Sequence, residues 1–107
     1  MPNISIIGYG YWGRKLARNF QNSTFFDILS IVDKKKTNLN DAKKNLPFVE
    51  CYSNYRNVVK NTLLDLIVIS TPTSTHYNIA KTALENSKHI LVEKPLSLSL
   101  KQVNNLN

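Results

Sequence analysis

The sequence has a single cysteine, Cys51, so a disulfide framework within the chain is excluded. Cys51 lies in a short apolar stretch that is typical of a strand. We interpret it as an inert, buried thiol and not as a nucleophile, because no motif around it suggests activation. The chain also lacks residues at the spacing of metal ligands, and we therefore expect no metal site.

Long hydrophobic runs are missing as well. The longest apolar stretch, LLDLIVIS at residues 63–70, is too short and too interrupted to span a bilayer. The first ten residues, MPNISIIGYG, contain neither the basic region nor the long apolar region of a signal peptide. We therefore expect a cytoplasmic protein that has no membrane partner.

Acidic residues are scarce, with 7 Asp and Glu against 14 Lys and Arg and a formal net charge of +7. This excess would permit binding to a polyanion. The basic residues are spread out, however, apart from a cluster at 34–36 and a pair at 43–44. Nucleic-acid-binding proteins usually concentrate charge on one face and interleave aromatic residues. We interpret the charge as a solvated surface and expect no nucleic-acid partner.

Short apolar, β-branched runs alternate with segments of helical periodicity along the chain. We expect strands at 3–8, 26–33, 48–52, 64–71 and 88–94, and helices at 11–21, 38–46, 54–62, 75–86 and 100–107. Strands joined by helices run parallel, and continuous apolar runs indicate strands that are covered on both faces. At 107 residues the chain is long enough for one domain. The pattern predicts an α/β fold, a doubly wound three-layer arrangement with a parallel sheet of about five strands.

Glycine is confined to one place. Gly8, Gly10 and Gly13 are the three glycines of the chain, and they fit G-x-G-x-x-G between a predicted strand and a predicted helix. Gly8 would allow a tight turn, Gly10 would let the backbone approach a pyrophosphate, and Gly13 would let the helix pack closely on the sheet. The pyrophosphate would then lie at the positive end of the helix. The motif predicts a dinucleotide-binding Rossmann fold.

Asp33 closes the next predicted strand, twenty positions after Gly13. An acidic residue there can accept hydrogen bonds from the adenosine ribose, although a turn or helix-cap residue is the alternative interpretation. Its charge would repel a 2′-phosphate, which favours NAD. Lys34 and its neighbours Lys35 and Lys36 follow at once, and one of them could pair with a phosphate. We expect NAD as the cofactor, with NADP as the alternative.

The C-terminal end of the sequence predicts one more helix. Ser99 and Gln102 match a capping box, which starts a helix. A doubly wound nucleotide-binding fold normally adds a sixth strand after this helix. We therefore expect residues 1–107 to form one NAD(P)-binding Rossmann domain that is incomplete at its C-terminus. An uncovered sheet edge would favour a homo-oligomer.

A second cluster of motifs lies in ISTPTSTHYNIAKTALENSKHILVEKPLSLS, residues 69–99. It combines a T-P-x-x-x-H motif at a strand exit with an E-K-P motif at the end of the next strand. Together with IGYGYWGRKLARNF it resembles the N-terminal domain of the Gfo/Idh/MocA oxidoreductase family, across essentially the whole chain. The GYWG variant at 10–13 is similar to members that act on nucleotide-linked amino sugars.

The resemblance implies a role for each motif. The three glycines and the backbone of Tyr11 and Trp12 would hold the pyrophosphate, and Asp33 would hold the adenosine ribose. Thr71 and Pro72, with the start of the next helix, would line the cofactor near its middle.

The resemblance also implies roles around the reacting end of the cofactor. His76 would line the cofactor, and Glu93 would lie close to the nicotinamide ribose. Lys94 would be the catalytic lysine between the nicotinamide and the substrate hydroxyl, where a partly desolvated lysine can polarise or deprotonate that hydroxyl.

The implied activity is that of an NAD(P)-dependent dehydrogenase. Family members transfer a hydride between the nicotinamide cofactor and a secondary hydroxyl of a sugar, nucleotide sugar or polyol, and they continue into a substrate domain that is missing from this sequence. The alternative is a stand-alone or truncated nucleotide-binding module without catalysis of its own. We expect the chain alone to bind dinucleotide weakly and to turn over little. Methyltransferases also have a glycine-rich turn after the first strand, but the E-K-P motif has no purpose there.

Overall fold

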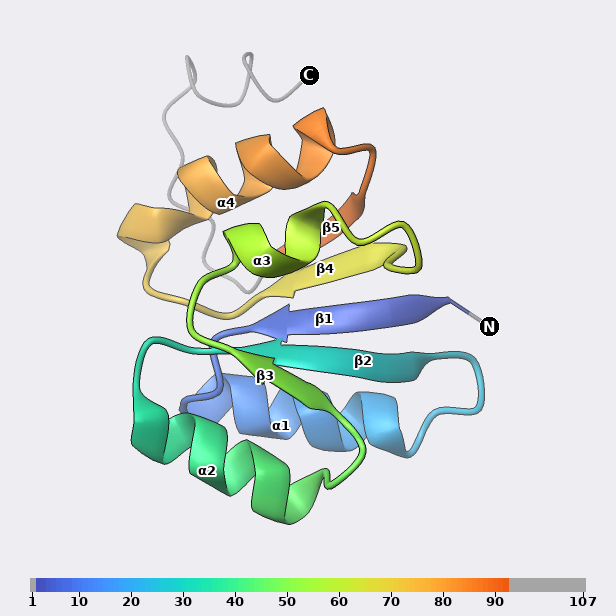
Figure 1. Ribbon diagram of the computed structural model, residues 1–107, viewed down its shortest axis with the longest axis vertical. Coiled ribbons are helices and arrows are strands. Elements are labelled where there is room, and N and C mark those ends of the chain that lie inside the picture. The colour runs from blue at the N-terminus through green and yellow to red at the C-terminus, as the bar shows by residue number, and fades with distance from the viewer. Residues whose placement is uncertain (1, 93–107) are drawn as a thin grey trace.

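The computed structural model describes residues 2–92, in which strands and helices alternate (Figure 1). The elements are β1 (Asn3–Ile7), α1 (Tyr11–Gln21), β2 (Asp27–Val32), α2 (Lys36–Asn45), β3 (Glu50–Tyr52), α3 (Arg56–Val59), β4 (Leu66–Ile69), α4 (Thr73–Glu85) and β5 (His89–Val92). The strands form one sheet in the order β3-β2-β1-β4-β5, and each neighbouring pair is parallel. The predicted α/β Rossmann architecture is confirmed.

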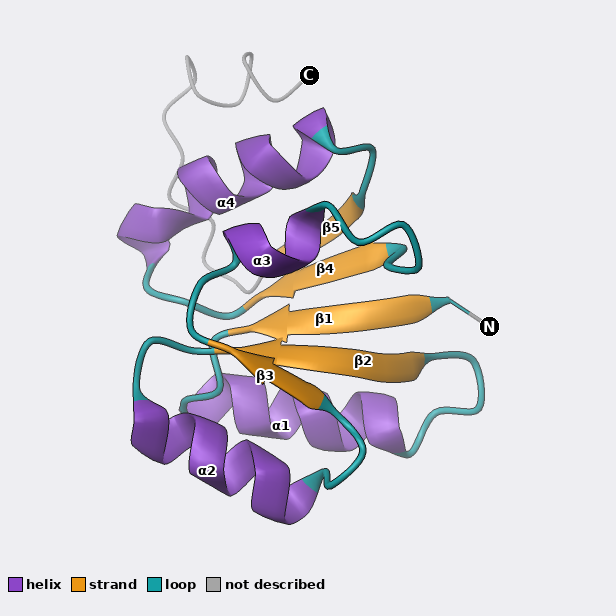
Figure 2. Cartoon of the chain, viewed as in Figure 1, coloured by secondary structure: helices purple, strands orange, loops and turns teal. Residues whose placement is uncertain are grey.

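Helices cover both faces of the sheet (Figure 2). Helices α1 and α2 pack on one face, and α3 and α4 pack on the other. Each face has its own apolar core, because successive residues of a strand point to opposite faces. The core under α1 and α2 includes Ile4, Ile6, Ala17, Ile31, Ala42 and Val68. The core under α3 and α4 includes Ile7, Val32, Val58, Ile67, Ile69 and Ile79.

One polar pair interrupts the apolar strands at the centre of the sheet. Ser5 on β1 lies opposite Ser30 on β2, directly after an irregularity in the register between Ile4 and Ser5. Both serines are buried, and the Ser30 hydroxyl donates a hydrogen bond of 2.8 Å to the Ser5 hydroxyl. Each buried hydroxyl thus finds a hydrogen-bond partner on the neighbouring strand, as is usual for buried polar groups.

The elements differ from the expected ranges at the ends of strands and helices alike, except for α1, which matches its predicted range. The most marked difference is α3, which has four residues where 54–62 was predicted as a helix. The Asn54 side chain accepts a hydrogen bond from the Arg56 amide, and the Asn61 side chain accepts one from the Leu63 amide. Such local bonds compete with helix formation, so the helix is confined between the two asparagines. The helix predicted at 100–107 lies outside the described residues.

Cys51 lies in β3, as the sequence predicted for a strand residue. Its side chain is half-buried and not fully buried as predicted, because β3 lies at the edge of the sheet, and its thiol donates to the Leu39 carbonyl oxygen at 3.9 Å. Burial raises the pKa of the Cys51 thiol, and the nearby Lys43 ammonium opposes that rise. A thiol with a raised pKa carries little thiolate near neutral pH, which supports an inert role.

Over residues 2–92, none of the helices combines the length and apolar character that a bilayer crossing requires.

Candidate functional site

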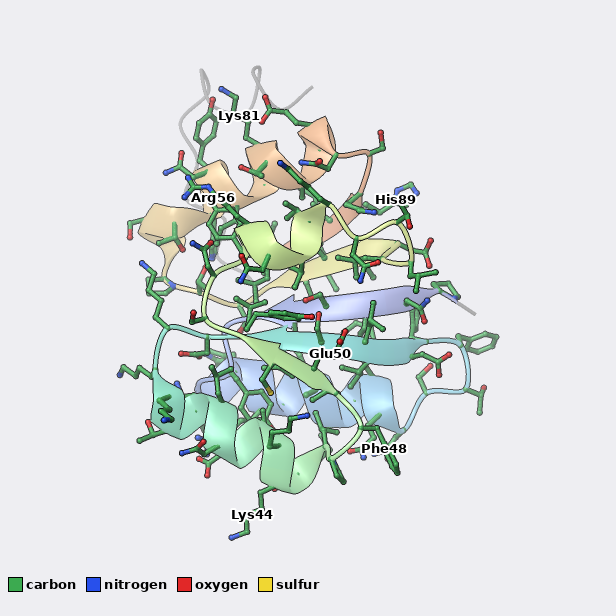
Figure 3. The ribbon with its side chains drawn as sticks, viewed as in Figure 1. Lys44, Phe48, Glu50, Arg56, Lys81 and His89 are labelled. Atoms are coloured by element: carbon green, nitrogen blue, oxygen red, sulfur yellow. The ribbon has the colours of Figure 1, made fainter. Side chains whose placement is uncertain are left out.

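A cleft of about 530 Å³ opens at the carboxyl ends of the strands. Its walls are the segments that follow four strands: Gly8 and Gly10 after β1, Asp33–Lys35 after β2, Ser53–Arg56 after β3, and Ser70–Pro72 after β4. Figure 3 shows Arg56 toward this end of the sheet and His89 toward the opposite end. Ligands of open parallel sheets bind outside these strand ends, at the point where the strand order reverses. In this sheet that point lies between β1 and β4.

The turn between β1 and α1 requires glycine at two positions, for different reasons. Gly8 has a φ of +102°, and a Cβ atom there would lie 2.6 Å from the Ser70 carbonyl oxygen. A Cβ atom on Gly13 would overlap the carbonyl oxygen of Gly8. Gly8 therefore allows the close approach of β4, and Gly13 allows α1 to lie directly against the turn. Both roles agree with those predicted from the motif.

Gly10 faces open space instead. A Cβ atom built on Gly10 would have no neighbour within 4 Å among the described residues. Gly10 is also the N-cap of α1, where no side chain caps the free N–H groups of the first turn. Ser70 also lines the cleft, and its hydroxyl is buried without a partner among residues 2–92. An open backbone, free N–H groups and an unpartnered hydroxyl fit a pyrophosphate group.

Asp33 holds the glycine turn as well as lining the cleft. Its Oδ2 accepts hydrogen bonds from the Tyr9 amide at 2.7 Å and from the Asn38 side-chain amide at 3.1 Å. Its Oδ1 accepts one from the Lys35 amide at 2.8 Å. A carboxylate has about four acceptor positions, so Oδ1 keeps a free one for a ribose hydroxyl. The turn role and the ribose role, which the sequence left as alternatives, are compatible at this one side chain.

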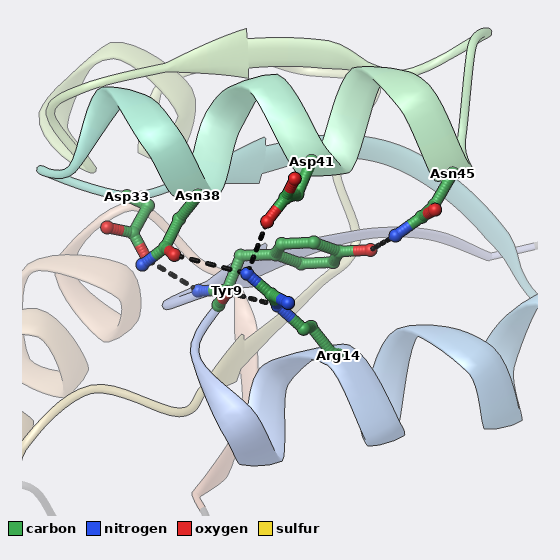
Figure 4. Close-up of polar contacts among 6 residues, drawn as sticks. All are labelled: Tyr9, Arg14, Asp33, Asn38, Asp41 and Asn45. Carbon is green, nitrogen blue, oxygen red and sulfur yellow. Dashed lines mark hydrogen bonds and ion pairs between the residues drawn. The ribbon is translucent and has the colours of Figure 1, made fainter.

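A polar network joins the turn to α2 (Figure 4). Arg14 on α1 donates to the Tyr9 carbonyl oxygen at 3.3 Å and forms an ion pair of 2.6 Å with Asp41 on α2. The guanidinium also lies over the ring of Tyr9, with its carbon 5.5 Å from the ring centroid. The buried Tyr9 hydroxyl accepts a hydrogen bond from Asn45 at 3.2 Å. The network connects the glycine turn to both α1 and α2.

The segment after β4 is ordered by a chain of hydroxyl groups. Thr75 donates to the Pro72 carbonyl oxygen at 2.7 Å, and the hydroxyl groups of Thr71 and Thr75 lie 2.6 Å apart. Because Thr75 uses its proton on Pro72, Thr71 must donate to Thr75. The remaining lone pairs of the Thr71 hydroxyl can therefore accept hydrogen bonds in the cleft.

His76 lies behind the cleft. Its side chain is 2% exposed, and Nε2 is 2.7 Å from the carbonyl oxygen of Thr71. A carbonyl oxygen only accepts, so Nε2 donates the hydrogen bond, and Nδ1 has no partner among the described residues. Any effect of His76 on a cofactor would pass through the backbone of Thr71.

The other predicted site residues are placed as follows. The side chains of Tyr11 and Trp12 are 67% and 54% exposed and pack edge to face under the ammonium of Lys15, so their backbone and not their rings belongs to the turn. Lys34 is exposed and lines the cleft, as does Pro72. Glu93 and Lys94 lie outside the described residues.

Several residues of the site were not singled out from the sequence. Tyr55 and Arg56 line the cleft, and Arg14 supports the turn. Ser70 begins the strand-exit segment STPTST, where functional residues were expected because strand exits meet at one edge of a parallel sheet, but no role was given to it individually. No local signal marks Arg14, since its partner Asp41 is 27 positions away.

Comparison with known proteins agrees with this geometry. A family model described as the oxidoreductase family with an NAD-binding Rossmann fold, Gfo/Idh/MocA, matches residues 2–107. The uncharacterized oxidoreductase YdgJ of Escherichia coli (strain K12) is 32% identical over 104 residues, which are 97% of this chain and 30% of that protein. The scyllo-inositol 2-dehydrogenase (NAD(+)) of Bacillus subtilis (strain 168) is 31% identical over 99 residues, 92% of this chain and 29% of that protein.

Solved structures share the fold. The crystal structure of scyllo-inositol dehydrogenase from Lactobacillus casei with bound NAD(H) and scyllo-inositol has a TM-score of 0.89 at 24% identity, over 99% of this chain and 32% of that one. This chain thus spans about a third of the length of such proteins. From the match over residues 2–107 and the glycine turn that fits a pyrophosphate, the chain belongs to the Gfo/Idh/MocA oxidoreductase family and carries its NAD-binding Rossmann domain.

Proposed function

We propose that this chain is the dinucleotide-binding part of an NAD(P)-dependent oxidoreductase that acts on a secondary hydroxyl of a sugar, nucleotide sugar or polyol. The observation that carries the proposal is the cleft at the carboxyl ends of the strands, which combines the glycine turn with Asp33 and with Thr71. The inositol substrates of the named relatives support the polyol class.

In this proposal each wall of the cleft holds one part of the dinucleotide. The N–H groups of the first turn of α1 and the hydroxyl of Ser70 donate to the pyrophosphate. Asp33 accepts from the adenosine ribose through the free position on Oδ1. Thr71 accepts from a hydroxyl nearer the middle of the cofactor, and His76 holds the Thr71 carbonyl in place.

The nicotinamide, when bound, supplies the hydride acceptor. Lys94 would polarise the substrate hydroxyl and Glu93 would contact the nicotinamide ribose, as the family resemblance implies. Hydride transfer needs the substrate carbon to be held close to the nicotinamide. Because the chain spans about 30% of the length of the curated relatives it matches, we expect it to bind dinucleotide and to show little turnover by itself.

Calorimetric titration with NAD, NADH and NADP tests the proposal. Gly10→Val should abolish binding of each of them, because the new side chain would fill the open space that a pyrophosphate needs. Thr24→Val, in the exposed loop before β2, is the matched control and should bind like the parent chain.

Two results would contradict the proposal. A parent chain that binds none of the three dinucleotides would remove the assigned ligand class. A Gly10→Val chain that binds as well as the parent would place the dinucleotide somewhere other than this cleft.

A further inference from the structure

Three cationic residues and one acidic residue line the β2 and β3 end of the cleft. Lys34 and Lys35 follow Asp33 on one side, and Arg56 lies on the other, after β3. The Asp33 amide donates to the Tyr52 carbonyl oxygen at 3.1 Å, which ties the two strand exits together. This end of the cleft therefore has a formal charge of about +2, from three cations and one anion.

The Asp33 carboxylate already has three hydrogen-bond donors within the protein. Its oxygens accept hydrogen bonds from the amides of Tyr9 and Lys35 and from the Asn38 side chain. Donors of this kind stabilise a carboxylate and reduce the field that it presents to a second anion. Repulsion between Asp33 and a 2′-phosphate is thus weaker than the sequence alone indicates.

Arg56 is positioned before any ligand arrives. Its amide donates to the Asn54 side chain at 2.9 Å, and its guanidinium carbon lies 5.3 Å from the centroid of the Tyr55 ring. The side chain remains exposed at the cleft. A planar guanidinium binds phosphate with two parallel hydrogen bonds, and stacking on an aromatic ring reduces the entropy lost on binding.

We infer that Arg56 is a specificity-determining residue that binds the 2′-phosphate of NADP, so that this chain binds NADP as well as NAD. The inference rests on the proposed dinucleotide site and adds the identity of the phosphate at its adenosine end. The ribose hydroxyls would lie at Asp33, and a 2′-phosphate there would face the open end of the cleft that Lys34 and Arg56 border.

The test compares 5′-AMP with 2′-phospho-AMP, and NAD with NADP, by calorimetric titration of the whole chain. The shorter probes report on the adenosine end without the nicotinamide half. Arg56→Gln should lower the ratio of NADP affinity to NAD affinity by about tenfold or more, because a charge-assisted hydrogen bond to the phosphate is lost. Arg56→Lys should give a smaller loss, since it keeps the charge but not the planar fork.

Arg18→Gln is the matched control, because Arg18 is exposed in the last turn of α1. It should leave the affinity ratio unchanged.

The possible outcomes separate the inference from the proposed function. If NAD binds and NADP does not, the inference fails and the proposed site stands. If Arg56→Gln weakens both cofactors equally, the guanidinium contacts the shared adenosine and not the phosphate, and the inference again fails. If no dinucleotide binds, the proposed function itself fails.

Discussion

Gly10 and Gly13 belong to one motif, but different physical limits restrict them to glycine. Gly13 is limited by the protein, because a Cβ atom would overlap the Gly8 carbonyl oxygen. Gly10 is limited by the expected ligand, because the space beside it is open. A methyl group at position 13 should therefore destabilise the fold. A methyl group at position 10 should leave the fold intact and interfere with the ligand.

Gly13→Ala should lower the free energy of unfolding by about 3 kcal/mol, since the backbone of the turn must move to admit the methyl group. Gly10→Ala should change it by less than about 0.5 kcal/mol, as is usual for a substitution in open space. Urea unfolding of the two variants beside the parent chain measures both values. Equal losses would mean that Gly13 does not limit the packing of α1.

Residue roles were predictable from the sequence where they depend on local spacing. The turn roles of the glycines follow from their order between a strand and a helix. The contact of Asp33 with the Tyr9 amide joins residues 24 positions apart. A pair this far apart in the sequence cannot be predicted from the periodicity of apolar residues. The family resemblance implied that His76 lines the cofactor, but the sequence could not show that its ring turns inward to the Thr71 carbonyl.

At the scale of elements, strands and helices other than α3 were predicted about equally closely, and α1 matches its predicted range at both ends. The apolar runs mark β1, β2 and β4 to within a few residues, because both faces of these strands are buried. Helix α2 begins two residues before the predicted start. The Lys35 amide, directly before the helix, donates a hydrogen bond to the Asp33 side chain, and this bond positions the first turn. Side-chain bonds to the backbone thus decide the helix ends that periodicity leaves open.

The serine pair between β1 and β2 allows a quantitative test. Ser5→Ala or Ser30→Ala alone should lower the free energy of unfolding by about 1–3 kcal/mol, because the remaining buried hydroxyl loses its partner. The double variant should lose less than the sum of the two single losses, since no unpaired hydroxyl remains. A double-mutant cycle measured by urea unfolding gives the coupling, and strictly additive losses would show that the two hydroxyls do not interact.

At the scale of the whole molecule, the parallel direction of the strands followed from their alternation with helices, whereas the order β3-β2-β1-β4-β5 was not predicted. Crossovers of this kind make neighbouring strands parallel, and parallel strands bring their exits to one edge. The sequence could therefore place the glycine turn, Asp33 and the T-P segment at a common cleft. It could not place Arg56 there, because nothing in the local pattern fixes where the short α3 lies relative to β2.

Binding at that cleft should stabilise the whole chain. At about one hundred times its dissociation constant, NAD should add about 2.7 kcal/mol to the free energy of unfolding and raise Tm by about 10 °C. Gly10→Val should unfold near the parent temperature without NAD and gain nothing when NAD is added. Thermal unfolding by circular dichroism measures both. A variant that gains the same shift as the parent would show that NAD stabilises the chain from another site.

The carboxylate of Asp33 also limits how the cofactor preference of this protein can be redesigned. A neutral residue at 33 would remove a negative charge from the ribose site, but the amides of Tyr9 and Lys35 bond to different oxygens of Asp33, so even asparagine would leave one of them without its acceptor. The phosphate-binding turn would loosen with the change in selectivity. Substitutions at Lys34 or Arg56 avoid this coupling, because neither side chain supports the turn. Engineering should therefore begin at these two positions and retain the acid.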